Sequence, residues 1–166
     1  MTASTNAASP TAAPKELRFT RDFDAAPTLV FQAWSEARHL ARWFAPRGFS
    51  VPVCEVDLRP GGTLYLVMRG PDGSDYPMRG VYHEVEPPAR LVFTSTVLDG
   101  QGRSVLEVRN TVTFAPQGAG TRLTLHARVV AATEAAAFYL AGMEQGWRET
   151  LDRLGEALAE APQAAH

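Results

Sequence analysis

Apolar residues near the C-terminal end of the chain recur every three or four positions, a spacing typical of one long amphipathic helix. We expect this helix to cover residues 133–160. At about 1.5 Å per residue it is roughly 40 Å long, enough to cross a small sheet. The residues that share its apolar side are Leu140, Met143, Trp147, Leu151, Leu154 and Leu158.

The beginning of the chain predicts one strand followed by two short helices. Apolar and polar residues alternate from Leu17 to Phe23, which is the period of a half-buried strand. Pro27 then indicates a helix start, because proline is favoured in the first helical turn. The apolar spacing after it predicts helices over residues 27–34 and 36–44.

The middle of the chain consists of short alternating segments separated by turn signals. Two of these signals are Arg59-Pro60-Gly61-Gly62 and Gly70-Pro71-Asp72-Gly73, both typical of tight turns. Short turns join neighbouring strands, so the pattern favours an antiparallel meander. The predicted strands cover residues 51–58, 64–68, 78–85, 90–98, 106–114 and 123–129.

The chain has 166 residues, a length that suits one domain, which we expect to cover residues 15–160. Residues 1–14 have neither a periodic apolar face nor the features of a secretory signal, so we expect a disordered tail. Residues 161–166 are expected to form a short C-terminal tail. No segment approaches the roughly 20 apolar residues of a membrane helix, so we expect a soluble, cytoplasmic protein that does not bind membranes.

Charge and cysteine content argue against several classes of protein. The 16 basic and 18 acidic side chains give a net charge of −2, without the basic excess of a nucleic-acid binder. Cys54 is the only cysteine, so no intramolecular disulfide can form, which fits a reducing compartment. It also has no second ligand at a zinc-site spacing, and we expect neither a metal nor a cofactor.

Short motifs, spread in order along nearly the whole chain, carry a likeness to a known family. They are Phe31-Gln32-Ala33-Trp34, Leu40-Ala41-Arg42-Trp43-Phe44, Asp57-Leu58-Arg59-Pro60-Gly61-Gly62, Gly80, Glu84-Val85-Glu86-Pro87-Pro88-Ala89-Arg90-Leu91-Val92-Phe93-Thr94, and Gly142-Met143-Glu144-Gln145-Gly146-Trp147 with Leu151 and Leu154. Together they resemble the START-like, or SRPBCC, superfamily, and within it the branch related to the C-terminal domain of the activator of the heat-shock-protein-ninety ATPase. The resemblance implies an α+β helix-grip fold: a seven-stranded curved antiparallel sheet with two short helices and a long C-terminal helix over a cavity.

In many relatives this cavity holds a small hydrophobic or aromatic molecule. A bent sheet and a straight helix cannot touch everywhere, so a gap remains unless large side chains fill it. Such side chains either pack as ordinary core or, where methionine is present, form an adaptable pocket wall. The candidates for this interior are Leu64, Leu66, Met68, Phe93, Met143 and Trp147.

Two polar residues, His83 and Asn110, are also candidates for the cavity. Each has a valine two positions before it and two positions after it, so alternation places it inward if those valines face inward. Burial without a partner costs about 1–3 kcal/mol, so each should be hydrogen-bonded or should orient a ligand. A bulge in either strand would shift the face by one residue and expose the side chain.

The sequence shows no nucleophile–base pair, metal cluster or nucleotide motif, so we expect a binding protein for a small hydrophobic or aromatic molecule rather than an enzyme. Two alternatives stay open. One is a cyclase- or hydrolase-like enzyme, with His83 as its acid–base candidate. The other is a cochaperone-like activator of the heat-shock ATPase, although the family's activator also uses a separate N-terminal domain that residues 1–14 cannot replace. A homodimer is a further expectation, because relatives often pair.

Overall fold

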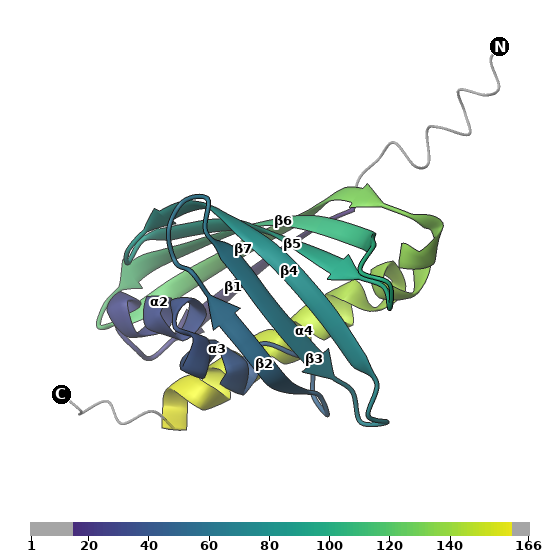
Figure 1. Cartoon of the computed structure of the whole chain (residues 1–166). Helices are drawn as coiled ribbons and strands as arrows, with labels where there is room; N and C mark the ends of the chain where they lie inside the picture. Colours follow the sequence, from purple (N-terminus) through teal and green to yellow (C-terminus); the bar gives the residue numbers. More distant parts are fainter. Residues whose placement is uncertain (1–14, 161–166) are drawn as a thin grey trace, which may run out of the picture.

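The computed structural model describes residues 15–160, which form a curved sheet wrapped around helices (Figure 1). Our expectations for residues 1–14 and 161–166 lie outside this range. The sheet is antiparallel, with seven strands in the order β1-β7-β6-β5-β4-β3-β2. The strands are β1 (Glu16–Phe23), β2 (Ser50–Val56), β3 (Thr63–Arg69), β4 (Asp75–Glu86), β5 (Arg90–Leu98), β6 (Ser104–Gln117) and β7 (Gly120–Ala132).

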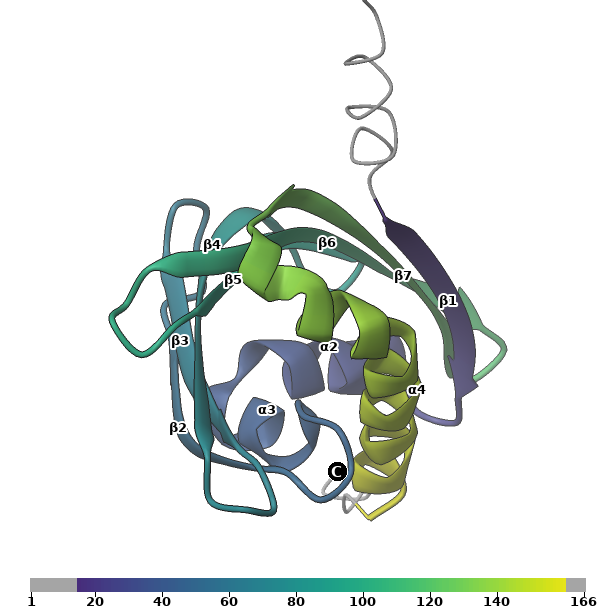
Figure 2. The same ribbon diagram turned by 90° about the vertical axis from the view of Figure 1, so that its right-hand side faces the viewer.

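The helices lie on the concave side of this sheet. Figure 2 shows the strands as an arc around the two short helices, with the long helix running along the open side. The helices are α2 (Pro27–Ser35), α3 (Ala37–Trp43), the 3₁₀ turn η1 (Glu134–Ala136) and α4 (Ala137–Glu160). The predicted α+β helix-grip fold is confirmed. Of the long helix predicted over residues 133–160, Thr133 is extended and residues 134–136 form the 3₁₀ turn.

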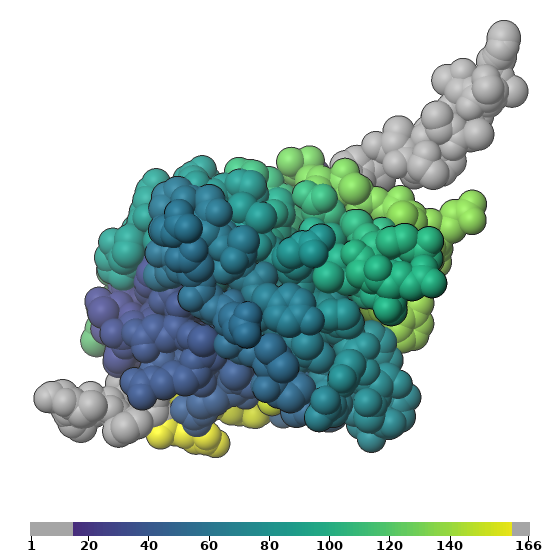
Figure 3. Space-filling model, viewed as in Figure 1, coloured from purple at the N-terminus to yellow at the C-terminus, as the bar shows by residue number. Residues whose placement is uncertain are grey.

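Consecutive hairpins build most of the sheet, because β2 to β7 follow one another as a meander. The first strand joins at the far end by pairing with the last, so Glu16 lies opposite Arg128 and Phe23 lies opposite Thr121. Helices α2 and α3 carry the chain from this edge of the sheet to the other. Figure 3 shows the outer face of β2 to β4 as a continuous surface, with α2 and α3 at one end of it.

Two glycines allow the chain to approach itself closely where the sheet bends. A Cβ atom at Gly62, in the turn between β2 and β3, would lie 2.0 Å from the carbonyl oxygen of Asp57. A Cβ atom at Gly80, within β4, would lie 2.5 Å from the carbonyl oxygen of Thr94. Both distances are shorter than any carbon–oxygen contact, so only glycine fits at these positions without a backbone shift.

The main hydrophobic core fills the space between the concave face, helices α2 and α3, and the C-terminal half of α4. Trp34 on α2 is at its centre, with ring centroids 4.8 Å from Trp43, 6.2 Å from Phe44 and 6.3 Å from Phe114. Such edge-to-face pairs add to the stabilisation that burial provides. The aromatic motifs of residues 31–44 therefore anchor the two short helices to the sheet.

Helix α4 is buried unevenly along its length. Of its predicted apolar side, Leu151, Leu154 and Leu158 are buried in the main core. Leu140 and Met143 remain partly exposed and pack against a second, smaller apolar cluster. That cluster consists of the buried residues Val105, Leu106, Val108, Ala127, Val129 and Ala136.

Within residues 15–160, no helix combines the length and the apolar character needed to span a membrane.

Candidate functional site

An apolar cavity of about 200 Å³ lies between the sheet and the N-terminal half of α4. Strands β3 to β6 form its floor, and the segment after α3 forms one wall with Phe44 and Pro46. The cavity therefore lies where the main core and the second cluster meet, and both clusters contribute to its lining. The apolar floor residues are Met68, Met78, Val97, Leu106 and Val108.

Two glycines on α4 keep this space open. Gly142 and Gly146 both line the cavity, one helical turn apart. A Cβ atom at Gly142 would meet no other atom within 4 Å, and one at Gly146 would first meet Cγ of Pro46 at 3.8 Å. Because these two positions carry no side chain, the helix covers the sheet here without filling the gap below it.

Trp147 connects the helix wall of the cavity to the main core. Its ring is nearly parallel to that of Trp34, with centroids 6.3 Å apart and 21° between the planes. It also meets Phe44 edge-to-face at 5.7 Å. These contacts tie Trp147 to the main core while one side of it lines the cavity.

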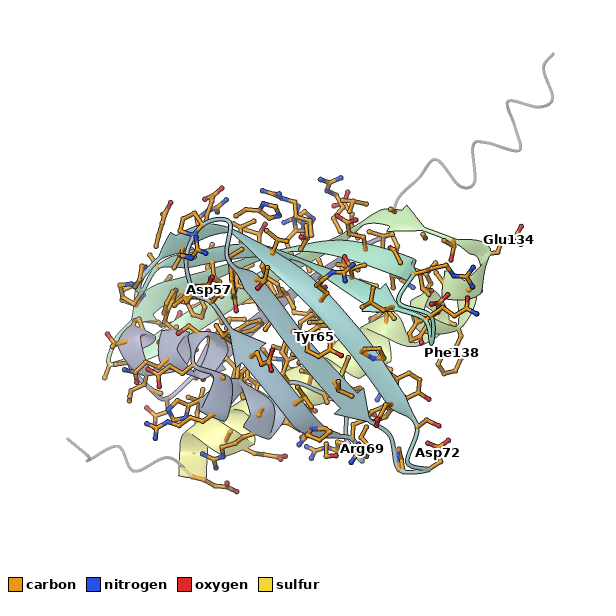
Figure 4. The ribbon with its side chains drawn as sticks, in the orientation of Figure 1. Asp57, Tyr65, Arg69, Asp72, Glu134 and Phe138 are labelled. Carbon is orange, nitrogen blue, oxygen red and sulfur yellow. The ribbon has the colours of Figure 1, made fainter. Side chains whose placement is uncertain are left out.

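Aromatic rings also follow the rim of the cavity at the start of α4. Tyr139 lines the cavity and meets Tyr76 at 6.4 Å, and Tyr76 in turn lies 5.9 Å from Phe49. Burial and the neighbouring Tyr76 raise the pKa of Tyr139, so its hydroxyl stays neutral at physiological pH. Phe138 is 74 % exposed and points away from the sheet, as Figure 4 shows.

Asn110 is the main polar group in the lining, and its side chain is completely buried. Its Nδ2 donates to Oγ of Ser95 at 3.1 Å, and lies 3.4 Å and 3.5 Å from the carbonyl oxygens of Phe93 and Val108. Carbonyl oxygens only accept, so the amide nitrogen must face them and the side-chain oxygen must face elsewhere. That oxygen, Oδ1, has no hydrogen-bond partner among residues 15–160.

The rest of the lining is neutral. Among the described residues around the cavity there is no Asp, Glu, Lys, Arg or His. A charged molecule entering this space would lose its hydration without gaining an opposite charge, so the lining favours an uncharged one. Nor does the described part of the chain place three or more His, Cys, Asp or Glu side chains where they could hold a metal ion.

Four of the eight predicted site residues come together at the cavity. Met68, Asn110, Met143 and Trp147 all line it. The other three apolar candidates, Leu64, Leu66 and Phe93, face the same side of the sheet but are buried in the main core.

The prediction that His83 faces inward was wrong. A β-bulge lies at this point of β4, since Tyr82 pairs with Phe93 and Glu84 pairs with Val92, which leaves His83 without a cross-strand partner. Tyr82 takes the buried position instead, and His83 is exposed on the outer face, with Nε2 3.3 Å from Oγ1 of Thr94. The bulge interrupts the regular alternation of inward and outward residues along β4. The sequence pattern of the strand alone does not reveal such a bulge.

Several lining residues that shape the site were not among the predicted ones, including Phe44, Ser95, Tyr139 and the two glycines Gly142 and Gly146. Ser95 is two residues after Phe93 on β5, so the same alternation could have identified it. Phe44 belongs to the motif that ends the second short helix, and it both packs in the main core and forms a wall of the cavity. Tyr139 lies beside the predicted apolar side of α4, and no pattern in the sequence indicated its place at the rim.

Cys54 is not prepared to act as a nucleophile. Burial raises the pKa of its thiol to about 11, so the reactive thiolate is scarce near neutral pH. Burial likewise raises the pKa of the Tyr82 hydroxyl. Both groups are therefore neutral parts of the core.

A larger depression, of about 920 Å³, lies between β1 and the C-terminal half of α4. Its charged side chains are largely paired with one another, Arg21 with Asp152 at 2.7 Å and Arg47 with Glu156. Such exposed pairs form a solvated surface. The smaller apolar cavity is thus the better candidate for a binding site.

A curved antiparallel sheet that holds a long C-terminal helix over an apolar cavity defines a helix-grip protein of the SRPBCC superfamily. The family model described as "Activator of Hsp90 ATPase homolog 1-like protein" matches residues 24–159. The chain belongs to this family, which confirms the resemblance seen in its motifs.

Solved structures agree with this assignment. A protein from Nitrosomonas europaea is 32% identical, with a TM-score of 0.73 over 87% of this chain and 94% of the other. The AHSA1 protein from Silicibacter pomeroyi is 28% identical, with a TM-score of 0.75 over 87% of this chain and 98% of the other. A protein from Arthrobacter aurescens, at 24% identity and a TM-score of 0.79 over 92% of this chain and 94% of the other, shares the fold. No curated protein matches the chain.

Proposed function

We propose that this protein binds a small, uncharged, mainly apolar molecule in the cavity below the N-terminal half of α4. The observation that carries the proposal is the cavity itself, which stays open between two packed clusters because Gly142 and Gly146 have no side chains to fill it. A neutral lining with one buried amide is the usual composition of a small-molecule site.

The volume limits the size of the molecule. An engineered cavity of about 150 Å³ accommodates benzene, whereas sites for drug-sized molecules measure roughly 300–1,000 Å³. A space of about 200 Å³ therefore suits a molecule of one or two rings. The methionines Met68 and Met143 add polarizable, adaptable walls on opposite sides of it.

Thermal unfolding with toluene, indole and naphthalene as probes tests the proposal. A molecule that binds only the folded state stabilises it by RT ln(1 + [L]/Kd), about 2.7 kcal/mol at a hundred times Kd. We expect a dose-dependent rise in Tm with at least one probe. Substitution Gly142→Leu should reduce this rise strongly, because the new side chain enters the space beside the cavity without first clashing with the backbone.

Ala141→Leu is the matched control, because Ala141 is an exposed neighbour on the same helix and does not line the cavity. This variant should respond to the probes as the unchanged protein does. An absence of any Tm response to all three probes would contradict the proposal. An equal response in the Gly142→Leu variant would place the binding elsewhere on the protein.

The family match supports a second candidate, stimulation of the Hsp90 ATPase, because that activity gives the family its name. The direct test is the ATPase rate of purified Hsp90 with increasing amounts of this protein. A saturable increase would support the cochaperone role. A constant rate would rule out direct stimulation and would not affect the ligand-binding proposal.

A further inference from the structure

Asn110 lines the cavity, and its side-chain oxygen is a buried hydrogen-bond acceptor. The residue is completely buried, and Oδ1 makes no hydrogen bond with any residue from 15 to 160. Native proteins rarely leave a buried polar atom in this state, and each exception calls for an explanation. A ligand that donates a hydrogen bond to Oδ1 provides one.

Ser95 adds the complementary group beside it. Its Oγ accepts the hydrogen bond from Nδ2 of Asn110 at 3.1 Å, so the hydroxyl hydrogen of Ser95 is not used in that contact. The lining has two further hydroxyls: Thr150 already donates to the carbonyl oxygen of Gly146 at 2.7 Å, and Tyr139 lies near the start of α4. The polar end of the cavity thus combines one free acceptor with one free donor.

A ligand hydroxyl matches both, because it donates one hydrogen bond and accepts another. The lining of the same cavity also includes the ring of Trp147, the ring of Phe44 and the thioether of Met143. Aromatic rings and sulfur both pack well against another aromatic ring.

We propose that the cavity selects hydroxylated aromatic molecules of one or two rings, with the ligand hydroxyl donating to Oδ1 of Asn110 and accepting from Ser95. This inference rests on the proposed function and adds the ligand class to it. Aromatic carboxylates are excluded, because a negative charge would face the carbonyl oxygen of Asn110 and no described lining residue is positively charged.

The test compares p-cresol with p-xylene, which differ only by a hydroxyl in place of a methyl group. A purely apolar cavity binds p-xylene at least as tightly, because p-xylene is the more hydrophobic molecule. A cavity with an unpaired amide oxygen should bind p-cresol about tenfold more tightly than p-xylene. Isothermal titration calorimetry measures both Kd values. Benzoate should show no measurable binding.

Substitution Asn110→Leu keeps the size of the side chain and removes its polar atoms. We expect p-cresol to bind about tenfold more weakly to this variant, while p-xylene binds as before or more tightly. Ser95→Ala serves as a second variant, because Ser95 is only half-buried and its loss should weaken p-cresol binding without preventing folding. Thr96→Ala, on the same strand but facing outward, is the matched control and should change neither Kd.

The outcomes separate this inference from the proposed function. Binding of both molecules to the unchanged protein, with p-xylene equal or tighter, would overturn the hydroxyl preference and leave the apolar site in place. A p-cresol preference that survives both Asn110→Leu and Ser95→Ala would overturn the assignment to this amide and hydroxyl. Failure of both molecules to bind, together with failure of toluene, indole and naphthalene, would overturn the binding function itself.

Discussion

The ring of Trp147 on α4 stacks on the ring of Trp34 on α2, with centroids 6.3 Å apart. Trp34 is in turn packed between the sheet and the short helices, next to Phe93 and Phe114. The side chain of Trp147 therefore belongs both to the core and to the cavity wall. Tyr139 and Met143, further toward the start of α4, pack against the second cluster and line the cavity.

Trp147→Ala should lower the free energy of unfolding by about 2–4 kcal/mol, somewhat less than a fully buried tryptophan costs, because Trp147 is partly exposed. Trp147→Phe should cost clearly less, since a ring still faces Trp34. Urea denaturation at equal m-values measures both. Equal stability of the alanine variant and the unchanged protein would mean that the stacking does not hold α4 in place.

Arg153 connects α4 by hydrogen bonds to residues 45–49, the segment that forms one wall of the cavity. Its guanidinium donates to the carbonyl oxygens of Ala45, Pro46 and Phe49 at 2.8–3.2 Å, and also to that of Arg42. Arg153→Lys keeps the charge but loses the planar fork, and should destabilise the protein by about 1–3 kcal/mol. Chemical denaturation is the measurement.

Arg148→Lys is the control for this change, because Arg148 forms an exposed pair with Glu144 one turn away on the same helix. Its effect should stay within about 0.5 kcal/mol. Similar costs for the two variants would contradict the role of Arg153 as the anchor of residues 45–49.

Two glycine substitutions should act in opposite directions. Gly142→Ala adds a methyl group that meets nothing within 4 Å and should stabilise the helix by about 0.5–1 kcal/mol. Gly62→Ala would force a Cβ atom to 2.0 Å from the Asp57 carbonyl oxygen, so it should lower Tm sharply. A loss of Tm in the Gly142→Ala variant would show that this face of α4 packs more closely than the structure indicates.

Burial raises the pKa of the Cys54 thiol to about 11, which makes stability depend on pH on the alkaline side. As pH rises through the range between the ordinary value of 9.0 and about 11, the unfolded chain loses a proton that the folded chain keeps. Stability therefore falls through this window and is independent of Cys54 at lower pH. The free energy of unfolding at pH 8 and pH 10 should differ less in a Cys54→Ala variant than in the unchanged protein.

A second measurement checks the same thiol directly. At pH 8, Cys54 in the folded protein should react with a thiol reagent much more slowly than in urea, because both burial and the raised pKa limit the thiolate. Equal rates in the two states would contradict the buried, neutral thiol.

His83→Ala should change the free energy of unfolding by no more than about 0.5 kcal/mol, because His83 is exposed on the outer face of the sheet. For the same reason it should leave the affinity for p-cresol unchanged. Asn110→Leu, by contrast, is expected to remove the preference for p-cresol. If His83→Ala weakened p-cresol binding, the bulge at Tyr82 and Glu84 would be placed wrongly.

The two polar candidates show when the alternation of inward and outward residues along a strand predicts the position of a side chain correctly. Alternation predicts an inward side chain at both His83 and Asn110, and this prediction is confirmed on β6, where no bulge lies between Val108 and Val112. It failed on β4 because the bulge after Tyr82 changes the side on which the following residues lie. A bulge depends on how the neighbouring strand pairs, so one strand's sequence does not reveal it.

The sequence by itself determined the elements of this protein and their order, because the spacing of apolar residues and the turn motifs act locally. It also determined one apolar side of the long helix and the family to which the chain belongs. Only the tertiary structure decided that Leu151 is buried while Met143 borders an open space, since the spacing on a helix does not specify how far away the sheet lies. The tertiary structure likewise placed Phe44, Ser95 and Tyr139 around one cavity, because these residues are far apart in the chain and meet only when the sheet curves around the helices.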